Sequence, residues 1–205
     1  SVAGGSGDVR TVFAGAAQAV RRVETCIRPQ AQVVGRWVRK PPFRVTLLDS
    51  TLDRSNFNSG SAPLDTYFQR QVTQDIRRRV TACFVALTDN DAVAGYYTLA
   101  STSMLLTELP ASVAKKLPRY PLVPAVRMGR LAVDRDCRGL GLGSALLADA
   151  LDRATRAEIA AFALLVDAKD DAAAAFYRHH GFVALPSAGR TLFLPLATGL
   201  RLMDG

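Results

Sequence analysis

Three glycines stand at alternate positions in the stretch RGLGLGS, residues 138–144, directly before a run with the pattern of a helix. Glycine is entropically costly in an ordered chain, so this spacing indicates that something comes close to the backbone. Main-chain N–H groups at the start of a helix, together with about half a positive charge from the helix dipole, bind phosphate groups. We therefore predict a diphosphate-binding loop, to which an arginine adds a charge-assisted bond. Its residues are Arg138, Gly139, Leu140, Gly141, Leu142, Gly143 and Ser144.

Two common nucleotide-binding patterns do not fit this loop. The P-loop pattern GxxxxGK[ST] requires a lysine after its last glycine, but Ser144 follows Gly143. The dinucleotide pattern GxGxxG requires a different glycine spacing and a strand directly before the first glycine. Tight packing of a helix against a strand, with glycines for clearance, is the structural alternative.

The elements around the loop alternate between short strands and helices. Apolar runs bounded by turn residues predict strands at 43–48, 81–88, 92–102, 125–134, 161–168, 182–185 and 191–198. Helical spacing of apolar residues predicts helices at 61–79, 110–117, from the glycine stretch to about Ile159, and 170–180. This order predicts an α/β fold with a mixed central sheet and helices on both faces.

The first 43 residues differ from the rest in composition. They are rich in Ala, Gly, Val and Arg, contain one acidic residue after Asp8, and end at Pro41-Pro42. Apolar residues recur in them at helical spacing, which predicts an amphipathic helix. We therefore predict a basic N-terminal extension, 1–43, and one α/β domain, 44–205.

Charge and cysteine content limit the classes of partner. The formal charge is +8, and residues 1–130 hold 18 Lys and Arg against 9 Asp and Glu. A polyanionic partner should therefore meet this part of the chain, although a basic surface that serves only solubility is the alternative. Three cysteines without CxxC or Cys/His spacing predict neither disulfides nor zinc, and favour a reducing cytoplasm. The longest apolar runs are far shorter than the roughly 20 residues of a membrane span.

Two motifs in the same order carry a family resemblance. The stretch GRLAVDRDCRGLGLGSALLADAL resembles the coenzyme A diphosphate loop of the GNAT (Gcn5-related) N-acetyltransferases. The stretch AAAAFYRHHGFVAL is similar to that family's second marker, a helix that lies over the thioester. The resemblance implies a GNAT acyl-CoA N-acyltransferase fold, acetyl-CoA as cosubstrate and no metal. It also implies that the main chain of Leu131, Ala132 and Val133 pairs with the pantetheine amides, and that Phe176 contacts the cofactor.

The resemblance places the phenol of Tyr177 at the sulfur, as proton donor to the departing thiolate. A phenol with a pKa of about 10 can donate to a thiolate whose conjugate acid has a pKa near 8.5. The alternative is that the Phe176-Tyr177 pair only packs its helix against the sheet, which suits Phe176 better. His179 and His180 precede Gly181 in the last helical turn, where cations suit the helix dipole and solvent, so we assign them no catalytic role.

A narrower resemblance covers roughly residues 44–200. The stretches NFNSGSAPLDTYFQRQ, AGYYTLAST, LPRYPLVPAVRMGRLAVD and FVALPSAGRTLFLPL resemble the GNAT toxins of bacterial toxin and antitoxin pairs. Members of that group acetylate the α-amino group of aminoacyl-tRNA and so stop translation. Their partner is a small ribbon-helix-helix antitoxin that also binds DNA. This sequence departs from the group in its 43-residue extension and in NSG at 58–60, where a cysteine often precedes the glycine.

An aminoacyl-tRNA acceptor would need little help with deprotonation. A free α-amino group has a pKa of about 7.7 to 8.0, so part of it is neutral near pH 7 without a dedicated base. Glu108 and Asp134 are the candidate bases, but Glu108 suits a surface turn and Asp134 a strand end or cap. Two other functions stay open, namely acetylation of a protein N-terminus, lysine or small amine, and a non-catalytic acyl-CoA-binding module. The sequence does not decide between a monomer and a homodimer.

Two basic clusters could hold the phosphates of a tRNA without reading its sequence. One cluster closes the helix predicted at 61–79, and the other lies in the helix predicted at 110–117 and just after it. A solvated surface is the alternative for each. Their residues are Arg77, Arg78 and Arg79, and Lys115, Lys116 and Arg119.

Overall fold

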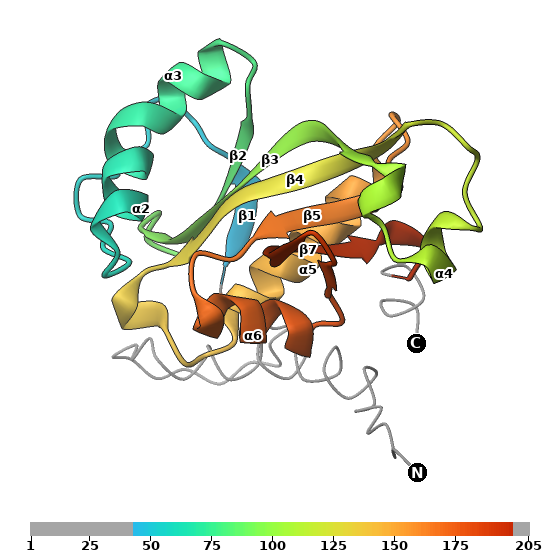
Figure 1. Cartoon of the computed structure of the whole chain (residues 1–205). Coiled ribbons are helices and arrows are strands. Elements are labelled where there is room, and N and C mark those ends of the chain that lie inside the picture. Colours follow the sequence, from blue (N-terminus) through green and yellow to red (C-terminus); the bar gives the residue numbers. More distant parts are fainter. Residues whose placement is uncertain (1–42, 199–205) are drawn as a thin grey trace, which may run out of the picture. The chain divides into compact units, whose positions relative to one another are not determined.

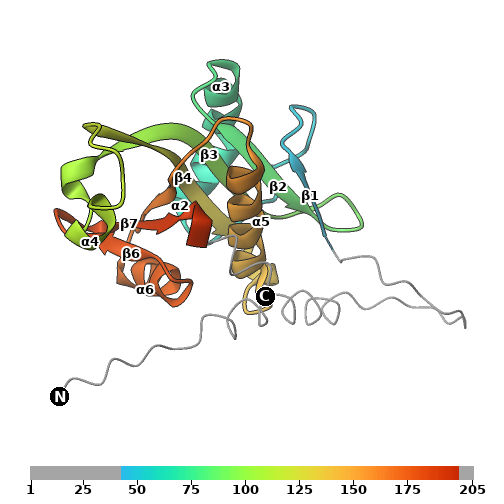
Figure 2. The ribbon, with the colours of Figure 1, turned by 90° about the vertical axis from the view of Figure 1, so that its right-hand side faces the viewer.

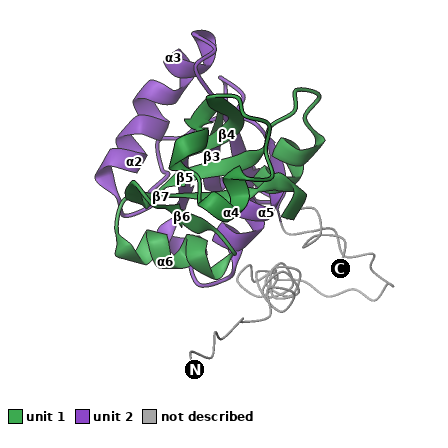
Figure 3. Cartoon of the chain, turned by 45° about the vertical axis from the view of Figure 1, so that its right-hand side comes forward, with its two compact units in different colours: residues 1–14, 99–129, 150–205 green, residues 15–98, 130–149 purple. Residues whose placement is uncertain are grey.

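The computed structural model describes residues 43–198, and the chain divides into two compact units (Figure 3). Within the described residues, unit 1 holds 99–129 and 150–198, and unit 2 holds 43–98 and 130–149. Seven strands in the described part form one sheet in the order β1-β2-β3-β4-β5-β7-β6 (Figure 1). This mixed sheet with helices confirms the predicted fold class. The predicted N-terminal extension lies outside the described residues, apart from Phe43.

Every strand predicted within the described residues is present. The strands are β1 (Arg44–Leu47), β2 (Ala82–Leu87), β3 (Val93–Leu105), β4 (Leu122–Val133), β5 (Ala163–Asp167), β6 (Val183–Leu185) and β7 (Ala188–Pro195). β4 and β5 pair in parallel, whereas β1 with β2, β5 with β7 and β6 with β7 pair antiparallel. The sheet is therefore mixed, since it contains the parallel pair β4 and β5 as well as antiparallel pairs.

One predicted helix of unit 2 is built from three segments. α2 (Ala62–Thr66), with Pro63 in its first turn, continues as a π-helical segment, Tyr67–Gln71, and then as α3 (Val72–Arg77). The π-helical segment buries Tyr67 and Phe68, and the Phe68 ring stacks on Tyr96 of β3 with 4.2 Å between ring centroids. The extra residue per turn is a local change that apolar spacing does not predict.

The core of unit 2 lies between this helix and its strands. Aromatic and aliphatic side chains fill it, which is typical of a helix that buries its apolar face against a sheet. The buried members are Phe57, Tyr67, Phe68, Val72, Cys83, Val85, Leu87, Tyr96 and Ala132.

Unit 1 contains β5, β6, β7 and two further helices. α6 (Asp171–His179) begins after Asp170, whose side chain accepts a hydrogen bond from the Ala173 N–H at 2.7 Å. It contacts β7 and lies beside β6 and β7 in Figure 2. α4 (Ala111–Ala114) is shorter than the predicted helix at 110–117, because a turn follows it. No helix in the described part of the chain is long and apolar enough to cross a membrane.

Candidate active site

The predicted diphosphate loop lies in unit 2, between the end of β4 and α5 (Leu142–Arg156). Gly139 and Gly141 have φ angles of 73° and 84°, in the left-handed region where a Cβ atom is costly. The first hydrogen bond of α5 joins the Ala145 N–H to the Gly141 carbonyl at 3.1 Å. Gly143 is therefore inside the first turn of the helix, whereas the sequence pattern placed all three glycines before it.

The main-chain N–H donors of this loop and the open space beside it suit an anion. α5 is 15 residues long, and N–H groups in the first turn of a helix have no acceptor within that helix. A Cβ atom on Gly139 would meet nothing within 4 Å, so the space beside this main chain is open. Arg138 and Gly139 are both exposed. A diphosphate fits the loop in charge, donor type and approach.

Arg138 also has a structural role that the sequence did not predict. Its guanidinium donates a hydrogen bond to the Ser59 carbonyl, and a Cβ atom on Gly60 would lie 3.5 Å from its Nη2. The Asn58 N–H donates to Asp134 Oδ2 at 2.9 Å. The turn at 58–60 is thus tied to the diphosphate loop, and the arginine keeps other N–H donors for an anion.

The end of β4 presents main-chain groups on the edge away from β3. The Asp134 N–H donates to the Ala94 carbonyl at 2.8 Å, and the Ala132 carbonyl faces Gly95 of β3. Because alternate residues of a strand direct their main-chain groups to opposite edges, those of Leu131 and Val133 face away from β3. In the described residues, the register of β4 with β5 ends at Met128 and Val166. An extended ligand with amide groups fits this edge.

Tyr177 lies in unit 1, on α6. Its side chain is 7% exposed, and its ring makes an edge contact with Phe176 at 5.3 Å and a tilted contact with Phe182 at 5.5 Å between centroids. Burial, assisted by the negative charge of Asp167, raises the pKa of Tyr177 to about 12. The phenol therefore stays protonated at neutral pH and is available as a proton donor. Phe176 is half-buried on the same helix.

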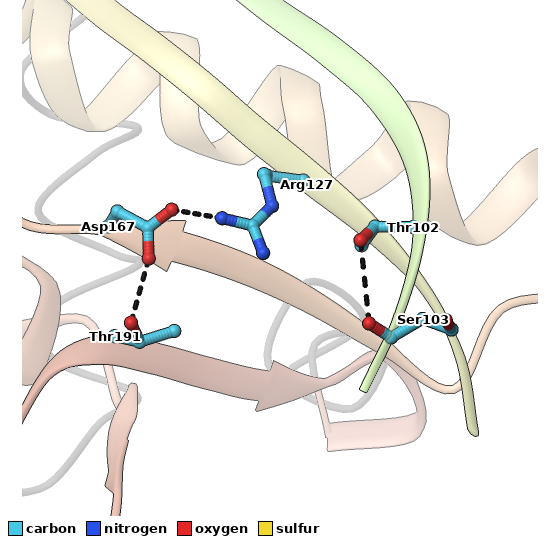
Figure 4. Close-up of polar contacts among 5 residues, drawn as sticks. All are labelled: Thr102, Ser103, Arg127, Asp167 and Thr191. Carbon is cyan, nitrogen blue, oxygen red and sulfur yellow. Dashed lines mark hydrogen bonds and ion pairs between the residues drawn. The ribbon is translucent and has the colours of Figure 1, made fainter. Parts of the chain in front are cut away.

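Three side chains of unit 1 form a polar group that the sequence did not single out (Figure 4). Asp167, the last residue of β5, accepts a hydrogen bond from Arg127 of β4 on one carboxylate oxygen. Thr191 of β7 donates to the other oxygen at 2.8 Å. The only sequence signal was an acidic residue at the end of the apolar run ALLVD.

His180 corrects one expectation from the sequence. It is 3% exposed, not solvated, and its Nδ1–H donates to the Phe176 carbonyl at 2.8 Å. Burial lowers the pKa of His180, so the ring caps the end of α6 in its neutral form. His179 is exposed, as predicted.

Asp134 is a structural cap. Its carboxylate accepts hydrogen bonds from the Asn58 N–H at 2.9 Å and the Asp136 N–H at 3.0 Å. Both oxygens are thus engaged in holding loops. Glu108 ends a short 3-10 segment after β3 and is half-buried, and Cys137 is half-buried beside the diphosphate loop. In the part of the chain that the structure describes, no group of three His, Cys, Asp or Glu side chains could hold a metal ion.

The two basic clusters are exposed. Arg77 ends α3 and Arg78 follows it as the C-cap, and Arg79 has a φ angle of 57°. Lys115 and Lys116 do not lie inside a helix, because α4 already ends at Ala114. With Arg119 they occupy the exposed turn that follows it.

Comparison with known families decides the class of enzyme. Residues 47–182 match the acetyltransferase (GNAT) family. The chain belongs to this family. As a GNAT protein it is an N-acetyltransferase, and acetyl-CoA is its acetyl donor. Acetyl-CoA supplies the thioester whose acetyl group is transferred.

Several known proteins are similar to this chain over most of its length. The chain is 39% identical over 148 residues to the tRNA-acetylating toxin of Mycobacterium tuberculosis, covering 71% of this chain and 86% of the toxin. It is 30% identical over 161 residues to the probable toxin TacT of Sinorhizobium fredii, covering 74% and 89%. AtaT complexed with acetyl-methionyl-tRNAfMet has a TM-score of 0.73 and 29% identity, covering 80% of this chain and 99% of AtaT. AtaTR bound with AcCoA has a TM-score of 0.69 and 27% identity, covering 78% and 98%.

Proposed function

We propose that this acetyltransferase transfers the acetyl group of acetyl-CoA to the α-amino group of aminoacyl-tRNA, and so acts as a toxin that blocks translation in the cytoplasm. The observation that carries the proposal is the 39% identity with a tRNA-acetylating toxin across 86% of that protein. The 29% identity with AtaT, whose structure holds acetyl-methionyl-tRNAfMet, supports the same acceptor.

Within this function we assign cofactor binding to the main chain of 131–144 and proton donation to Tyr177. The loop 138–144 holds the diphosphate, and the main-chain groups of Leu131 and Val133 pair with the pantetheine amides. Ala132, which the sequence resemblance also assigned to this pairing, turns its carbonyl toward β3 instead. Tyr177 donates a proton to the sulfur as the acetyl group leaves, with Phe176 packing beside the cofactor. The open space at Gly139, the direction of the β4 groups and the protonated phenol support these roles.

The two exposed basic clusters are assigned to the tRNA backbone. Arg77–Arg79 and the turn holding Lys115, Lys116 and Arg119 place positive charge on the surface, where phosphates can reach it. Contacts of this kind position a nucleic acid without reading its sequence. The aminoacyl group would then be selected at the acceptor site and not by these clusters.

We further propose that a small ribbon-helix-helix antitoxin neutralises the protein. The resemblance to the GNAT toxins and the 30% identity with a probable toxin support a partner of this type. A ribbon-helix-helix reading frame beside this gene, whose product copurifies with the protein and restores growth, is the expected result. Light scattering of the purified protein then decides between a monomer and a homodimer.

The acceptor is tested by incubating the full-length protein with labelled acetyl-CoA. Total charged tRNA, uncharged tRNA, polyamines and peptides with free N-termini or lysines are supplied in parallel. We expect label on charged tRNA alone, as a base-labile product that releases the N-acetylated amino acid. Label only on polyamines or peptides would overturn the tRNA function in favour of a general amine acetyltransferase.

A further inference from the structure

Asp167 is an accessible acid at the end of a buried strand. The other four residues of β5 are buried, whereas the Asp167 side chain is 48% exposed. Asp167 is the first β5 residue past the register with β4, which ends at Met128 and Val166. The carboxylate therefore stands where the pairing of β5 with β4 has ended, and solvent or a ligand can reach it.

The carboxylate is held from both sides but keeps capacity for a ligand. Arg127 donates to Oδ2, and Thr191 donates to Oδ1 at 2.8 Å (Figure 4). A carboxylate offers about four lone-pair sites, so two of them remain. Partners on β4 and β7 fix its direction, which is how a functional side chain is kept in place.

The same carboxylate interacts electrostatically with the proposed proton donor. Its negative charge acts on the Tyr177 phenol and contributes to the raised pKa of that group. Two other acids of unit 1 are engaged elsewhere, since Asp170 caps α6 and Asp152 pairs with Arg156 on α5. General acid and base catalysis needs one group that accepts a proton and one that donates a proton. The Asp167 carboxylate suits the first role and the protonated Tyr177 phenol suits the second.

We propose that the Asp167 carboxylate, oriented by Arg127 and Thr191, binds the α-amino group of the acceptor and takes the proton that its nitrogen loses as the amide forms. This inference rests on the proposed function, because it names the group that receives the aminoacyl end of the tRNA. It fills the role of base for which Glu108 and Asp134 were the candidates from the sequence.

The step balances in atoms and charge. The amine nitrogen forms its bond to the acetyl carbon, and the bond from that carbon to sulfur breaks. One proton passes from nitrogen to Asp167, and one proton passes from the Tyr177 phenol to the thiolate sulfur. Transfer of a proton from Asp167 to the phenolate, through solvent, then restores both groups.

The first test measures acetylation of charged tRNA by full-length wild type, Asp167→Asn, Asp167→Glu and the control Asp152→Asn. Asp152 is also an arginine-paired acid, with a side chain 37% exposed. Asp167→Asn should lower kcat/KM for charged tRNA by about 100-fold. This loss is at the low end of the range for general base catalysis, because part of the amine is already neutral. The KM for acetyl-CoA should not change. Asp167→Glu should recover part of the loss, and Asp152→Asn should match wild type.

The second test separates binding of the amino group from a structural effect. In a Tyr177→Phe background, which slows turnover, binding of aminoacyl-tRNA is compared with that of the same tRNA deaminated to the α-hydroxyacyl form. The protein with Asp167 should prefer the amino form, and adding Asp167→Asn should remove that preference. Thr191→Val, which removes one hydrogen bond and keeps the charge, should weaken the preference without removing it, and serves if Asp167→Asn does not fold.

The possible results of these tests distinguish failure of the proposed function from failure of the inference about Asp167. A wild-type protein that acetylates no charged tRNA would overturn the proposed function, and this inference with it. A wild-type protein that does so, while folded Asp167→Asn keeps the same kcat/KM and the same preference for the amino form, would overturn the inference alone. Loss of activity in Asp167→Asn with an unchanged preference would also overturn it, because the carboxylate then does not contact the amine.

Discussion

The carbonyl oxygen of Ala132 lies 2.9 Å from the point where a Cβ atom would stand on Gly95. The same point is 2.9 Å from Cδ1 of Leu146, so β3 has no room for a side chain here. The glycine therefore allows β4 and α5 to approach β3 within unit 2. Both belong to the segments assigned to acetyl-CoA, so we expect the proposed cofactor site to depend on a glycine that lies outside these segments.

Gly95→Ala should destabilise the protein and weaken acetyl-CoA binding. An overpacked methyl group of this kind costs about 1–3 kcal/mol, because the main chain at Ala132 must move. Urea unfolding gives the free energy of unfolding, and calorimetry gives the affinity for acetyl-CoA. Gly189→Ala is the control, since a Cβ atom there meets nothing within 4 Å. Equal stability of the two variants would contradict the packing argument.

Tyr177→Phe should lower kcat and leave the fold intact. The phenyl ring keeps the contacts with Phe176 and Phe182, while the proton donor to the thiolate is removed. General acid catalysis contributes about 10²- to 10⁴-fold, so a loss of at least about 100-fold is expected. Steady-state kinetics on charged tRNA measure the loss in kcat. The affinity for acetyl-CoA and the melting temperature show whether cofactor binding and the fold are intact. Tyr120→Phe, at a 69% exposed tyrosine, should behave as wild type.

The rate should rise with pH without a fall from loss of the Tyr177 proton. The pKa of Tyr177 is raised to about 12, so the phenol stays protonated throughout a practical assay range. The α-amino group, with a pKa of about 7.7 to 8.0, becomes neutral and nucleophilic over that range. Values of kcat/KM, obtained from initial rates between about pH 6 and about pH 9.5, should therefore rise and then level off. A bell-shaped profile that falls before about pH 9.5 would mean that the acid is a group of lower pKa.

The fold could be predicted from the sequence because its elements follow local patterns. Apolar runs such as ALLVD and helical spacing such as that of 170–180 predicted the strands and helices of both units. The loop at 138–144 was also predictable, since glycines with positive φ are a backbone requirement that one stretch of sequence displays. What the sequence pattern missed there was the exact start of α5 and the hydrogen bond from Arg138 to the Ser59 carbonyl.

The rest depended on interactions between residues far apart in sequence. Arg127, Asp167 and Thr191 meet because β4, β5 and β7 are neighbours in the sheet, and no local pattern shows that order. The burial of His180 likewise depends on how α6 packs, whereas its place before Gly181 suggested solvent. The site roles of Tyr177 and the diphosphate loop stay predictions until the variants above are measured.

Neutralising Arg77 and Arg78 should weaken tRNA binding and its dependence on salt. Each phosphate that a basic side chain neutralises adds about 0.7 to 0.9 to the slope of log K against log salt, so removing each such arginine should lower the slope by this amount. Filter binding of charged tRNA at several salt concentrations measures it for Arg77→Gln/Arg78→Gln. The matched control is Arg156→Gln/Arg190→Gln, which removes two exposed arginines from surface ion pairs. An unchanged slope in Arg77→Gln/Arg78→Gln would show that this cluster does not contact the tRNA. The variant Lys115→Gln/Lys116→Gln tests the other cluster in the same way.

His180 should make the protein less stable in mild acid. Burial lowers the pKa of His180 below its usual value of 6.5, so the unfolded chain binds a proton more readily than the folded chain. The contribution of the neutral ring to the free energy of unfolding is therefore complete above about pH 6.5 and is lost as the pH falls toward the folded pKa. Urea unfolding at about pH 7.5 and about pH 5.5 should show a smaller difference in His180→Asn than in wild type. His179→Asn, at the exposed neighbour, should keep the wild-type difference, and an equal change in both variants would show that the buried ring is not its source.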